Sequence, residues 1–404
     1  METLTLVGCQ FGDEGKGKII DFLSKDYDLN VRFNGGENAG HTVVVGDRVI
    51  KYHLVPAGFL SAKSVVIASG VVVNLRRLVQ EIEFLKSFKS AFDLRISEIA
   101  HVVTELHFKR DKYLEGVRGK GIIGTTLKGI GPAYESKYGR YGIRLLDFED
   151  RQRLVDNLAL LSTIYQIPIE KGYIDELLED YEMIRGYLTD ARSFLQEQID
   201  DGKSALFETA QGTFIDIESG TYPFVTSSYT TSGGVTVGTG LPPKYFKKFM
   251  GVAKAYTTRV GEGMFPTEIF GTVGDQLRML GSEYGSTTGR PRRVGYLDLP
   301  MLRRAVKLNG LDYIALTKVD VLGKLKEVKV AVSYEQNGTE IEEFDPTVVP
   351  DKINYESFTP WEGEPSKLQS YIEFIESELK VPIVLLGIGE KREEIEVRGQ
   401  ISFD

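Results

Sequence analysis

Short continuous runs of apolar, often β-branched residues recur along the chain. They lie at residues 4–7, 43–45, 64–68, 205–207, 313–317, 328–332 and 383–386. Because these runs are continuous and bounded by glycine, rather than alternating with polar residues, they predict strands buried on both faces. The last run follows Pro382, which suits the start of a strand.

Helical spacing fills the segments between these runs. Apolar residues recur at helical spacing from Leu75 to Phe88 and from Leu368 to Leu379. Residues from about 149 to 200 have a charged, helical pattern with a break near Pro168. Strands that alternate with helices predict an α/β fold, with a central, mostly parallel sheet, flanking helices and ligands at the carboxyl ends of the strands.

The chain shows no repeat, low-complexity segment or linker that would divide it. We therefore expect a single large domain over residues 1–404, with a helical insertion at about 149–200. Residues 335–365 are polar and contain proline, which predicts a surface excursion rather than a domain boundary.

Charge and cysteine content narrow the class of protein. The 49 Lys and Arg residues are outnumbered by 58 Asp and Glu residues, and the net charge of −9 argues against non-specific nucleic-acid binding. A single cysteine, Cys9, excludes an intrachain disulfide, and its place after the first run predicts a small buried residue. A signal pattern and an apolar run approaching about 18 residues are both missing, which predicts a cytoplasmic protein without a membrane partner.

The glycine-rich stretch Gly12-Asp13-Glu14-Gly15-Lys16-Gly17-Lys18 is the most specific chemical signal. It lies between the first strand run and a helical pattern, where free backbone N–H groups surround an anion. Its spacing fits the start of a phosphate loop, so we expect a P-loop-NTPase-like arrangement. Ile19 stands where a standard loop has the Ser or Thr that holds Mg²⁺, and Asp13 lies inside the turn. This pattern predicts a phosphate site with a different metal ligand.

Further loops carry chemistry. His41 lies in a loop with three glycines and two asparagines, where it can donate to a phosphoryl oxygen. Three arginines follow the Ser/Thr/Gly residues 286–289 and form an anion trap. The strand run 313–317 ends in Thr-Lys-Val-Asp, a pattern by which GTP-binding proteins recognise guanine. The remaining histidines, His53, His101 and His107, lack metal-ligand spacing, so structural roles are expected for them.

In combination these stretches resemble the adenylosuccinate synthetase family from residue 4 to about 392. The matching motifs are QFGDEGKGK, RFNGGENAGHT, GTTLKGIGPAYESK, AQGTFIDIESGTYPFVTSS, KAYTTRVGEGMFPTE, TTGRPRR and LTKVDVL. The resemblance implies a homodimeric ligase that condenses IMP with L-aspartate while GTP is hydrolysed to GDP and phosphate.

The resemblance also implies roles for individual residues. Asp13 would remove the N1 proton of the base, so that O6 attacks the γ-phosphoryl group of GTP, while Lys16, His41 and Mg²⁺ stabilise the transferring group. Mg²⁺ would be held by Asp13 and the Gly40 carbonyl. The implied catalytic residues are Asp13, Lys16, His41 and Gln211.

The implied binding residues fall into three groups. GTP would contact Gly12, Glu14, Gly15, Lys16, Gly17, Lys18, Gly40, His41, Thr42, Arg292, Lys318, Asp320, Gly387 and Gly389. IMP would contact Asp13, Asn38, Thr126, Gln211, Thr226, Val260, Arg290 and, from the neighbouring subunit, Arg140. Aspartate would contact Ser286, Thr287, Thr288, Gly289, Arg290 and Arg292.

Departures from the family pattern leave two alternatives open. The late Ser-x-Gly-Pro motif of the family is Gly387-Ile388-Gly389-Glu390 here, on the far side of the guanine pocket. A variant ligase that acts on another 6-oxopurine nucleotide, such as dGMP, is one alternative. A GTP-binding switch protein is the other, although the arginine-rich loop and Ile19 argue against it.

Overall fold

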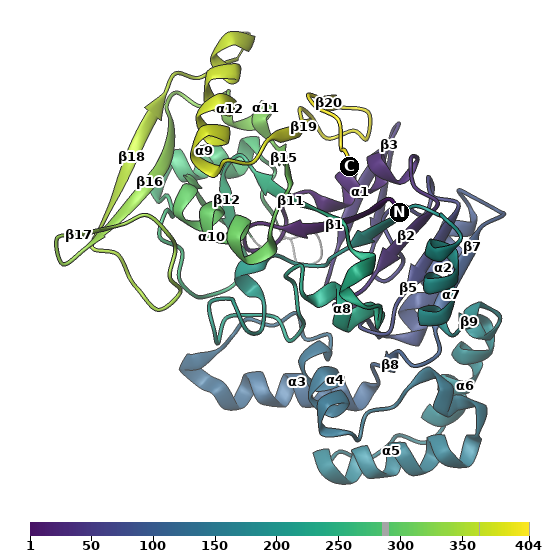
Figure 1. Ribbon diagram of the computed structural model, residues 1–404. Helices are drawn as coiled ribbons and strands as arrows, with labels where there is room; N and C mark the ends of the chain where they lie inside the picture. Colours follow the sequence, from purple (N-terminus) through teal and green to yellow (C-terminus); the bar gives the residue numbers. More distant parts are fainter. Residues whose placement is uncertain (285–290, 363, 404) are drawn as a thin grey trace.

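A ten-stranded sheet forms the centre of the molecule. The computed structural model describes residues 1–284, 291–362 and 364–403, and the sheet has the order β20-β19-β15-β11-β1-β10-β2-β5-β7-β9 (Figure 1). Every pairing from β9 to β19 is parallel, and β20 is antiparallel to β19. The strands are β1 (Thr3–Gly8), β2 (Leu29–Arg32), β5 (Ser64–Ile67), β7 (Asp93–Ser97), β9 (Leu188–Thr189), β10 (Ala205–Glu208), β11 (Lys248–Lys254), β15 (Tyr313–Thr317), β19 (Ile383–Gly387) and β20 (Ile395–Val397).

The predicted α/β class is confirmed, and β1 shows why its sequence is continuously apolar. All six residues of β1 are buried. Leu4 and Leu6 belong to one hydrophobic cluster, and Val7 belongs to a second cluster. Since successive side chains of a strand point to opposite faces, a strand covered on both faces needs apolar residues at consecutive positions.

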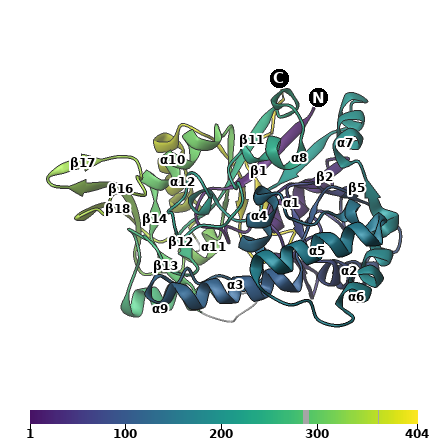
Figure 2. The same cartoon turned by 90° about the horizontal axis from the view of Figure 1, so that it is seen from below.

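Helices connect the strands and cover both faces of the sheet, with α1 and α2 packed against the face of Leu206 and α7 against the face of Phe207. Figures 1 and 2 place α3, α5 and α6 together on one side of the molecule. The α-helices of the described residues are α1 (Lys16–Ser24), α2 (Leu75–Lys86), α3 (Glu105–Arg118), α4 (Ile130–Gly139), α5 (Arg151–Tyr165), α6 (Tyr173–Ile184), α7 (Ala191–Asp200), α8 (Gly234–Thr239), α9 (Gly271–Leu280), α10 (Leu299–Asn309), α11 (Val319–Leu322) and α12 (Pro365–Leu379). In the described residues, no helix combines the length and apolar character needed to span a membrane.

The predicted helical segment at about 149–200 contains α5, α6 and α7, and its break near Pro168 falls between α5 and α6. It also contains the two-residue strand β9, which extends the central sheet next to β7 and was not predicted. That residues 1–404 form a single domain stays a prediction.

Two predicted strands lie outside the central sheet. β3 (His41–Val45) pairs antiparallel with β4 (Arg48–Tyr52), and β16 (Val328–Gln336) pairs antiparallel with β17 (Thr339–Ile341) and β18 (Lys352–Phe358). The prediction that both runs are buried on both faces is therefore wrong. Val44 and Val45 of the first run and Lys329 and Val332 of the second are only half-buried, because neither strand is covered on both faces.

The remaining short strands are β6 (Val72–Val73), β8 (His101–Val102), β12 (Thr257–Arg259), β13 (Arg293–Gly295) and β14 (Leu297–Asp298). The predicted surface excursion at 335–365 contains β17 and β18, which project from the body in Figure 1. No residue of β17 or β18 is fully buried, so these strands lack the apolar runs from which strands were predicted.

The parallel strands bring the candidate motifs to one edge of the sheet. The glycine-rich turn follows β1, the His41 loop follows β2, the Gln211 segment follows β10, and Lys318 and Ile388 follow β15 and β19. All five segments leave the carboxyl ends of neighbouring or next-neighbouring strands. This topology creates the place for a site.

One buried carboxylate, Asp298 of β14, connects β16 to the start of helix α10. Asp298 precedes α10, is fully buried, and accepts hydrogen bonds from the backbone N–H of Met301 (3.0 Å) and from the Tyr334 hydroxyl (2.6 Å). Burial raises the pKa of Asp298 to about 6.

We predict that Asp298→Ala lowers the free energy of unfolding by about 1–3 kcal/mol, because a helix cap is lost and the Tyr334 hydroxyl is left unpaired. The pKa of Asp298 is higher in the folded protein than in the unfolded chain, so the free energy of unfolding of the wild type falls as pH rises through about 6. Asp298→Asn, which cannot ionise, should lose less over the same range. Urea unfolding at pH 5 and pH 8 measures both effects. Equal pH dependence in the wild type and Asp298→Asn would contradict the account.

Candidate functional site

A cavity of about 730 Å³ lies at the carboxyl edge of the sheet. Its walls come from the turn after β1, the loop before β3, helix α3 with the loop that follows it, and the segment after β10. The predicted site residues that line it are Gly12, Asp13, Gly15, Lys16, Gly17, Asn38, Gly40, His41, Thr42, Thr126, Gln211, Thr226, Val260 and Arg292. The structure therefore brings together residues up to 280 positions apart in sequence, from Gly12 to Arg292.

A buried carboxylate organises the glycine-rich turn. Glu14 is fully buried, and its Oε1 accepts hydrogen bonds from the backbone N–H groups of Gln10 (3.0 Å) and Gly12 (2.8 Å). Its Oε2 lies 2.6 Å from Lys16 Nζ. Glu14 thus lies behind the cavity wall and fixes both the shape of the turn and the position of the Lys16 ammonium group.

Asp13 points the other way, into the cavity. Its φ of 60° is in the left-handed region, which a residue with a side chain adopts only at a cost. Its neighbours Gly12 (φ 91°) and Gly15 (φ 88°) adopt the same region without a Cβ. The turn therefore keeps Asp13 in a strained backbone conformation, and this conformation directs its carboxylate into the cavity.

His41 begins β3 and lies directly over helix α1. A Cβ atom built on Gly17 would lie 2.7 Å from the His41 Cβ, so position 17 has room only for glycine. His41 Nδ1 lies 2.6 Å from Oε1 of the fully buried Glu208. With Nδ1 engaged, Nε2 is the ring nitrogen left for a ligand in the cavity.

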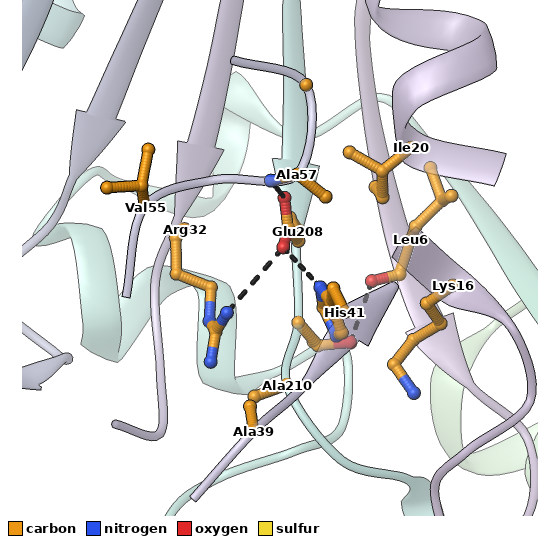
Figure 3. Close-up of polar contacts among 12 residues, drawn as sticks. Leu6, Lys16, Ile20, Arg32, Ala39, His41, Val55, Ala57, Glu208 and Ala210 are labelled. Carbon is orange, nitrogen blue, oxygen red and sulfur yellow. Dashed lines mark hydrogen bonds and ion pairs between the residues drawn. The ribbon is translucent and has the colours of Figure 1, made fainter. Parts of the chain in front are cut away.

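Glu208 ends β10 and holds three groups at once (Figure 3). Its Oε2 accepts a hydrogen bond from the backbone N–H of Ala57 (2.9 Å), and the buried Arg32 guanidinium lies 3.6 Å from its Oε1. Burial lowers the pKa of His41, and the Glu208 carboxylate opposes this effect. Glu208 thus fixes the orientation of the imidazole and tunes its proton affinity. Sequence analysis assigned it no role, although an acid that ends an apolar strand is a usable signal.

Arg292 connects Asp13 to a second buried carboxylate. Arg292 Nε lies 2.8 Å from Asp13 Oδ2, and Nη1 donates to Glu283 Oε2 at 2.8 Å. Glu283 also accepts hydrogen bonds from Lys254 Nζ (2.7 Å) and the Tyr256 hydroxyl (2.5 Å). Burial alone would raise the pKa of Glu283, but Lys254 and Arg292 hold it at about 2. Sequence analysis did not predict Glu283, Lys254 or Tyr256.

Gln211 follows β10 and lies beside the glycine-rich turn, where a Cβ atom built on Gly12 would lie 3.6 Å from the Gln211 Cα. Gln211 has a φ of 63°, and its Nε2 donates to Asn38 Oδ1 at 3.1 Å, while its buried Oε1 has no hydrogen-bond partner among the residues that the structure describes. Such an unpaired acceptor suits an N–H group of a ligand.

Helix α3 holds the loop that carries Thr126. Glu115 accepts from the N–H of Gly124 (3.0 Å), and Asp111 accepts from Thr125 Oγ1 and the N–H of Gly129, both at 3.0 Å. Arg110 and Arg118 of α3 also line the cavity and were not predicted.

The predicted guanine-binding residues lie beside the cavity and do not line it. Thr317 connects the two regions, because its hydroxyl donates to the Glu14 carbonyl at 2.6 Å. Oδ1 of Asp320 is buried, and no described residue forms a hydrogen bond with it. Lys318 Nζ lies 3.9 Å from Glu390 Oε1. Gly387 ends β19 next to Thr317, and Lys18 points toward Gly389 rather than into the cavity.

The remaining predicted residues do not line the cavity or lie outside the described residues. Arg140 is exposed at the end of α4 and does not line the cavity. Ser286, Thr287, Thr288, Gly289 and Arg290 lie outside the described residues. His107 is buried, accepts from the Thr104 N–H and contacts Ser136, in agreement with the structural role expected for it. Cys9 is buried as predicted, and burial raises the pKa of its thiol.

The residues at the turn are compatible with the metal that the sequence implied. Mg²⁺ is typically bound by one or two protein oxygens together with substrate phosphates. Asp13 and Gly40 both line the cavity, and Asp13 supplies a carboxylate there. Within the described ranges, no group of three or more His, Cys, Asp or Glu residues could hold a metal by itself.

The family model and the curated relatives that match this chain all belong to one enzyme family. The model of the adenylosuccinate synthetase family matches residues 5–396. The adenylosuccinate synthetase of Picrophilus torridus is 44% identical over 415 residues, which cover 97% of this chain and 99% of the relative. That of Halothermothrix orenii is 44% identical over 421 residues, with 98% of each chain covered.

A solved structure of the same family also matches the chain. The fully ligated adenylosuccinate synthetase from Plasmodium falciparum matches with a TM-score of 0.91 and 36% identity, over 99% of this chain and 100% of that one. The succinoaminodeoxyadenylate synthetase of cyanophage S-2L, bound to dGMP and dATP, matches with a TM-score of 0.66 and 19% identity, over 98% and 95% of the two chains, which shows a shared fold only. On the family match and the identity of the full-length relatives, the chain belongs to the adenylosuccinate synthetase family.

Proposed function

We propose that this protein is a GTP-dependent ligase that joins IMP and L-aspartate to form adenylosuccinate, GDP and phosphate. One observation carries the proposal: the glycine-rich turn, the Asp13 carboxylate and the His41 ring meet in one cavity, and the chain belongs to a family of such ligases. The reaction makes the first committed intermediate on the route from IMP to AMP.

The 6-oxygen of IMP is a poor leaving group, and the first step converts it into a good one. Asp13 takes the proton from N1 of the base, and the electron pair moves to O6. O6 attacks the γ-phosphorus of GTP, the bond to the β-phosphate oxygen breaks, and 6-phosphoryl-IMP and GDP form. The unpaired Oε1 of Gln211 supports a role in holding the base for this step.

Lys16 and His41 stabilise the transferring phosphoryl group. The Lys16 ammonium is held by Glu14, and the His41 ring is held by Glu208, so both donors are fixed before the substrate arrives. Such fixed donors lower the barrier because they need little rearrangement as charge develops. Asp13 and the Gly40 carbonyl would hold Mg²⁺, which when bound neutralises charge on the phosphates.

In the second step the amine of aspartate attacks C6, the C6–O6 bond breaks, and phosphate leaves with a proton from His41. The new C6–N group loses its surplus proton to solvent. The aspartate carboxylates are bound by the segment 286–290 together with Arg292. Arg290 also contacts IMP, whose phosphate and ribose lie against Asn38, Thr126, Thr226 and Val260. The protein acts as a cytoplasmic homodimer, in which the exposed Arg140 of each subunit completes the IMP site of the other.

Phosphate release from GTP tests the proposed function. We expect release only when Mg²⁺, IMP and aspartate are all present, with the change in ultraviolet absorbance that accompanies conversion of a 6-oxopurine into a 6-aminosuccinyl purine. Release that ignores IMP and aspartate would indicate a GTP-binding switch. Turnover of dGMP but not IMP would indicate the variant ligase, which the distant phage structure does not by itself favour.

We predict that Asp13→Asn lowers kcat by about 1,000-fold, because the amide cannot accept the N1 proton. Calorimetry should show that GDP binding is largely retained, since Glu14 and not Asp13 organises the turn. Asp26→Asn, an exposed carboxylate near the other end of α1, serves as the control and should behave as the wild type. Near-normal turnover of Asp13→Asn would exclude Asp13 as the base.

We predict that Glu208→Gln lowers kcat by about 100-fold and shifts the alkaline limb of the pH–rate profile to lower pH. The negative charge of Glu208 raises the pKa of His41, against the effect of burial. Removing that charge therefore lowers the pKa of His41. A general acid then loses its proton at lower pH.

Glu81→Gln is the matched control, because Glu81 is buried and accepts from the N–H groups of Leu54 and Val55 in the segment that also contacts Glu208. It does not contact His41, so the profile should not move. An unshifted profile in Glu208→Gln would contradict the role of Glu208.

A further inference from the structure

We propose that Lys18, which the sequence motif assigns to phosphate binding, instead positions the backbone that faces the guanine base. This inference rests on the proposed function, because it concerns the GTP site of that reaction. In this proposal Lys18 is a positioning residue for nucleotide recognition. Of the two lysines of the glycine-rich turn, Lys16 therefore contacts the phosphates and Lys18 does not.

The Lys18 ammonium group is directed away from the cavity. Lys16 and Gly17 line the cavity, whereas Lys18 does not. Lys18 is 8% exposed, and its Nζ donates to the carbonyl oxygens of Gly389 (2.8 Å) and Glu394 (2.6 Å). Burial lowers the pKa of Lys18 to about 8, with Glu394 opposing the effect. Two carbonyl oxygens therefore take the place of water around this charge.

Residues 388–394 form a compact turn that closes on itself. The N–H of Ile388 donates to the Glu394 carbonyl (3.0 Å), and the N–H of Glu394 donates to the Lys391 carbonyl (3.1 Å). The Glu394 carboxylate accepts from the N–H of Lys391 (2.7 Å). Because Lys18 holds the carbonyl groups near both ends of this turn, it fixes the turn as a unit.

A second contact fastens the same turn to the same helix. Arg392 forms an ion pair with the fully buried Asp21 of α1 (2.9 Å), and its backbone N–H donates to the Val44 carbonyl of β3 (3.0 Å). Helix α1 follows the phosphate-binding turn, and β3 begins with His41. The turn at 388–394 is thereby connected to the elements that carry the catalytic groups.

The held turn borders the guanine-recognition residues. Gly387 packs against β15 so closely that a Cβ atom on it would lie 3.2 Å from the Thr317 Cα. Glu390 lies 3.9 Å from the Lys318 ammonium group, and Oδ1 of Asp320, buried and without a partner in the described part of the chain, can accept a hydrogen bond from the base. In this proposal the guanine ring binds between Asp320 and the backbone at 387–389, and Lys18 holds the second of these two walls in place.

This geometry predicts a separation of KM from kcat. In Lys18→Met the two hydrogen bonds to Gly389 and Glu394 are lost while the length of the side chain is kept. We expect the KM for GTP to rise about tenfold and the preference for GTP over ATP in kcat/KM to fall. Turnover at saturating GTP and the KM values for IMP and aspartate should stay within about threefold of the wild type, because the phosphate-facing groups are unchanged. Lys25→Met, an exposed lysine just after α1, is the control and should change none of these values.

Two results would overturn the inference. If turnover at saturating GTP falls by about two orders of magnitude or more while the KM for GTP is unchanged, Lys18 acts on the phosphates. Unchanged KM and unchanged GTP preference in a folded Lys18→Met protein would show that the contacts do not position the base site.

A second variant and a binding measurement keep the inference testable in other cases. If Lys18→Met does not fold, the double variant Asp21→Asn/Arg392→Gln releases the same turn without leaving a buried charge unpaired, and should raise the KM for GTP in the same direction. If the wild type releases no phosphate, the proposed function fails. Calorimetry with GDP then decides the inference separately: about tenfold weaker binding in Lys18→Met supports it, and equal binding, or no binding by the wild type, contradicts it.

Discussion

Three fully or almost fully buried carboxylates fix the groups that line the cavity. Glu14 holds Lys16, Glu208 holds His41, and Glu283 holds Arg292, at distances of 2.6–2.8 Å. Each carboxylate lies behind the cavity wall and has further hydrogen-bond donors of its own. A buried carboxylate is costly unless it is paired and hydrogen-bonded. Loss of Lys16 would remove the ion pair of Glu14, whereas Glu208 and Glu283 would keep Arg32 and Lys254.

This arrangement explains how a protein with a net charge of −9 can have a site for polyanionic substrates. Cationic groups are concentrated at one edge of the sheet, and each is oriented before a substrate binds. Fixed donors contribute more to a transition state than mobile ones, because the cost of ordering them has been met during folding. The contact between Arg292 and Asp13 belongs to the same network, since Glu283 determines where the guanidinium group lies.

Much of this architecture could be predicted from local sequence patterns. The run at residues 4–7, the glycines at 12 and 15 and the apolar positions of α1 are consecutive, and they indicate strand, turn and helix without further information. The parallel sheet then requires that the loops after its strands meet at one edge. The prediction of doubly buried strands failed for β3 and β16, because a short apolar run does not reveal whether one or both faces will be covered.

The carboxylates behind the cavity could not be predicted in the same way. Glu208 contacts His41 across 167 positions of sequence, and Glu283 contacts Lys254 across 29, so no periodicity or spacing connects them. Lys18 is a related case: the motif predicts a phosphate ligand, but the side chain points to a turn 371 positions away. Tertiary contacts decide which member of a local motif faces the substrate.

Oxygen-isotope transfer tests the central claim most directly, namely that the cavity directs O6 of IMP to the γ-phosphoryl group of GTP. The measurement uses IMP labelled with ¹⁸O at the 6-position, together with GTP, aspartate and Mg²⁺, and follows the isotope by mass spectrometry of the released phosphate. We predict that each phosphate carries one ¹⁸O atom, because the C6–O6 bond breaks after O6 has been phosphorylated. Phosphate without the label would show that water, and not O6, attacks GTP, and would contradict the account.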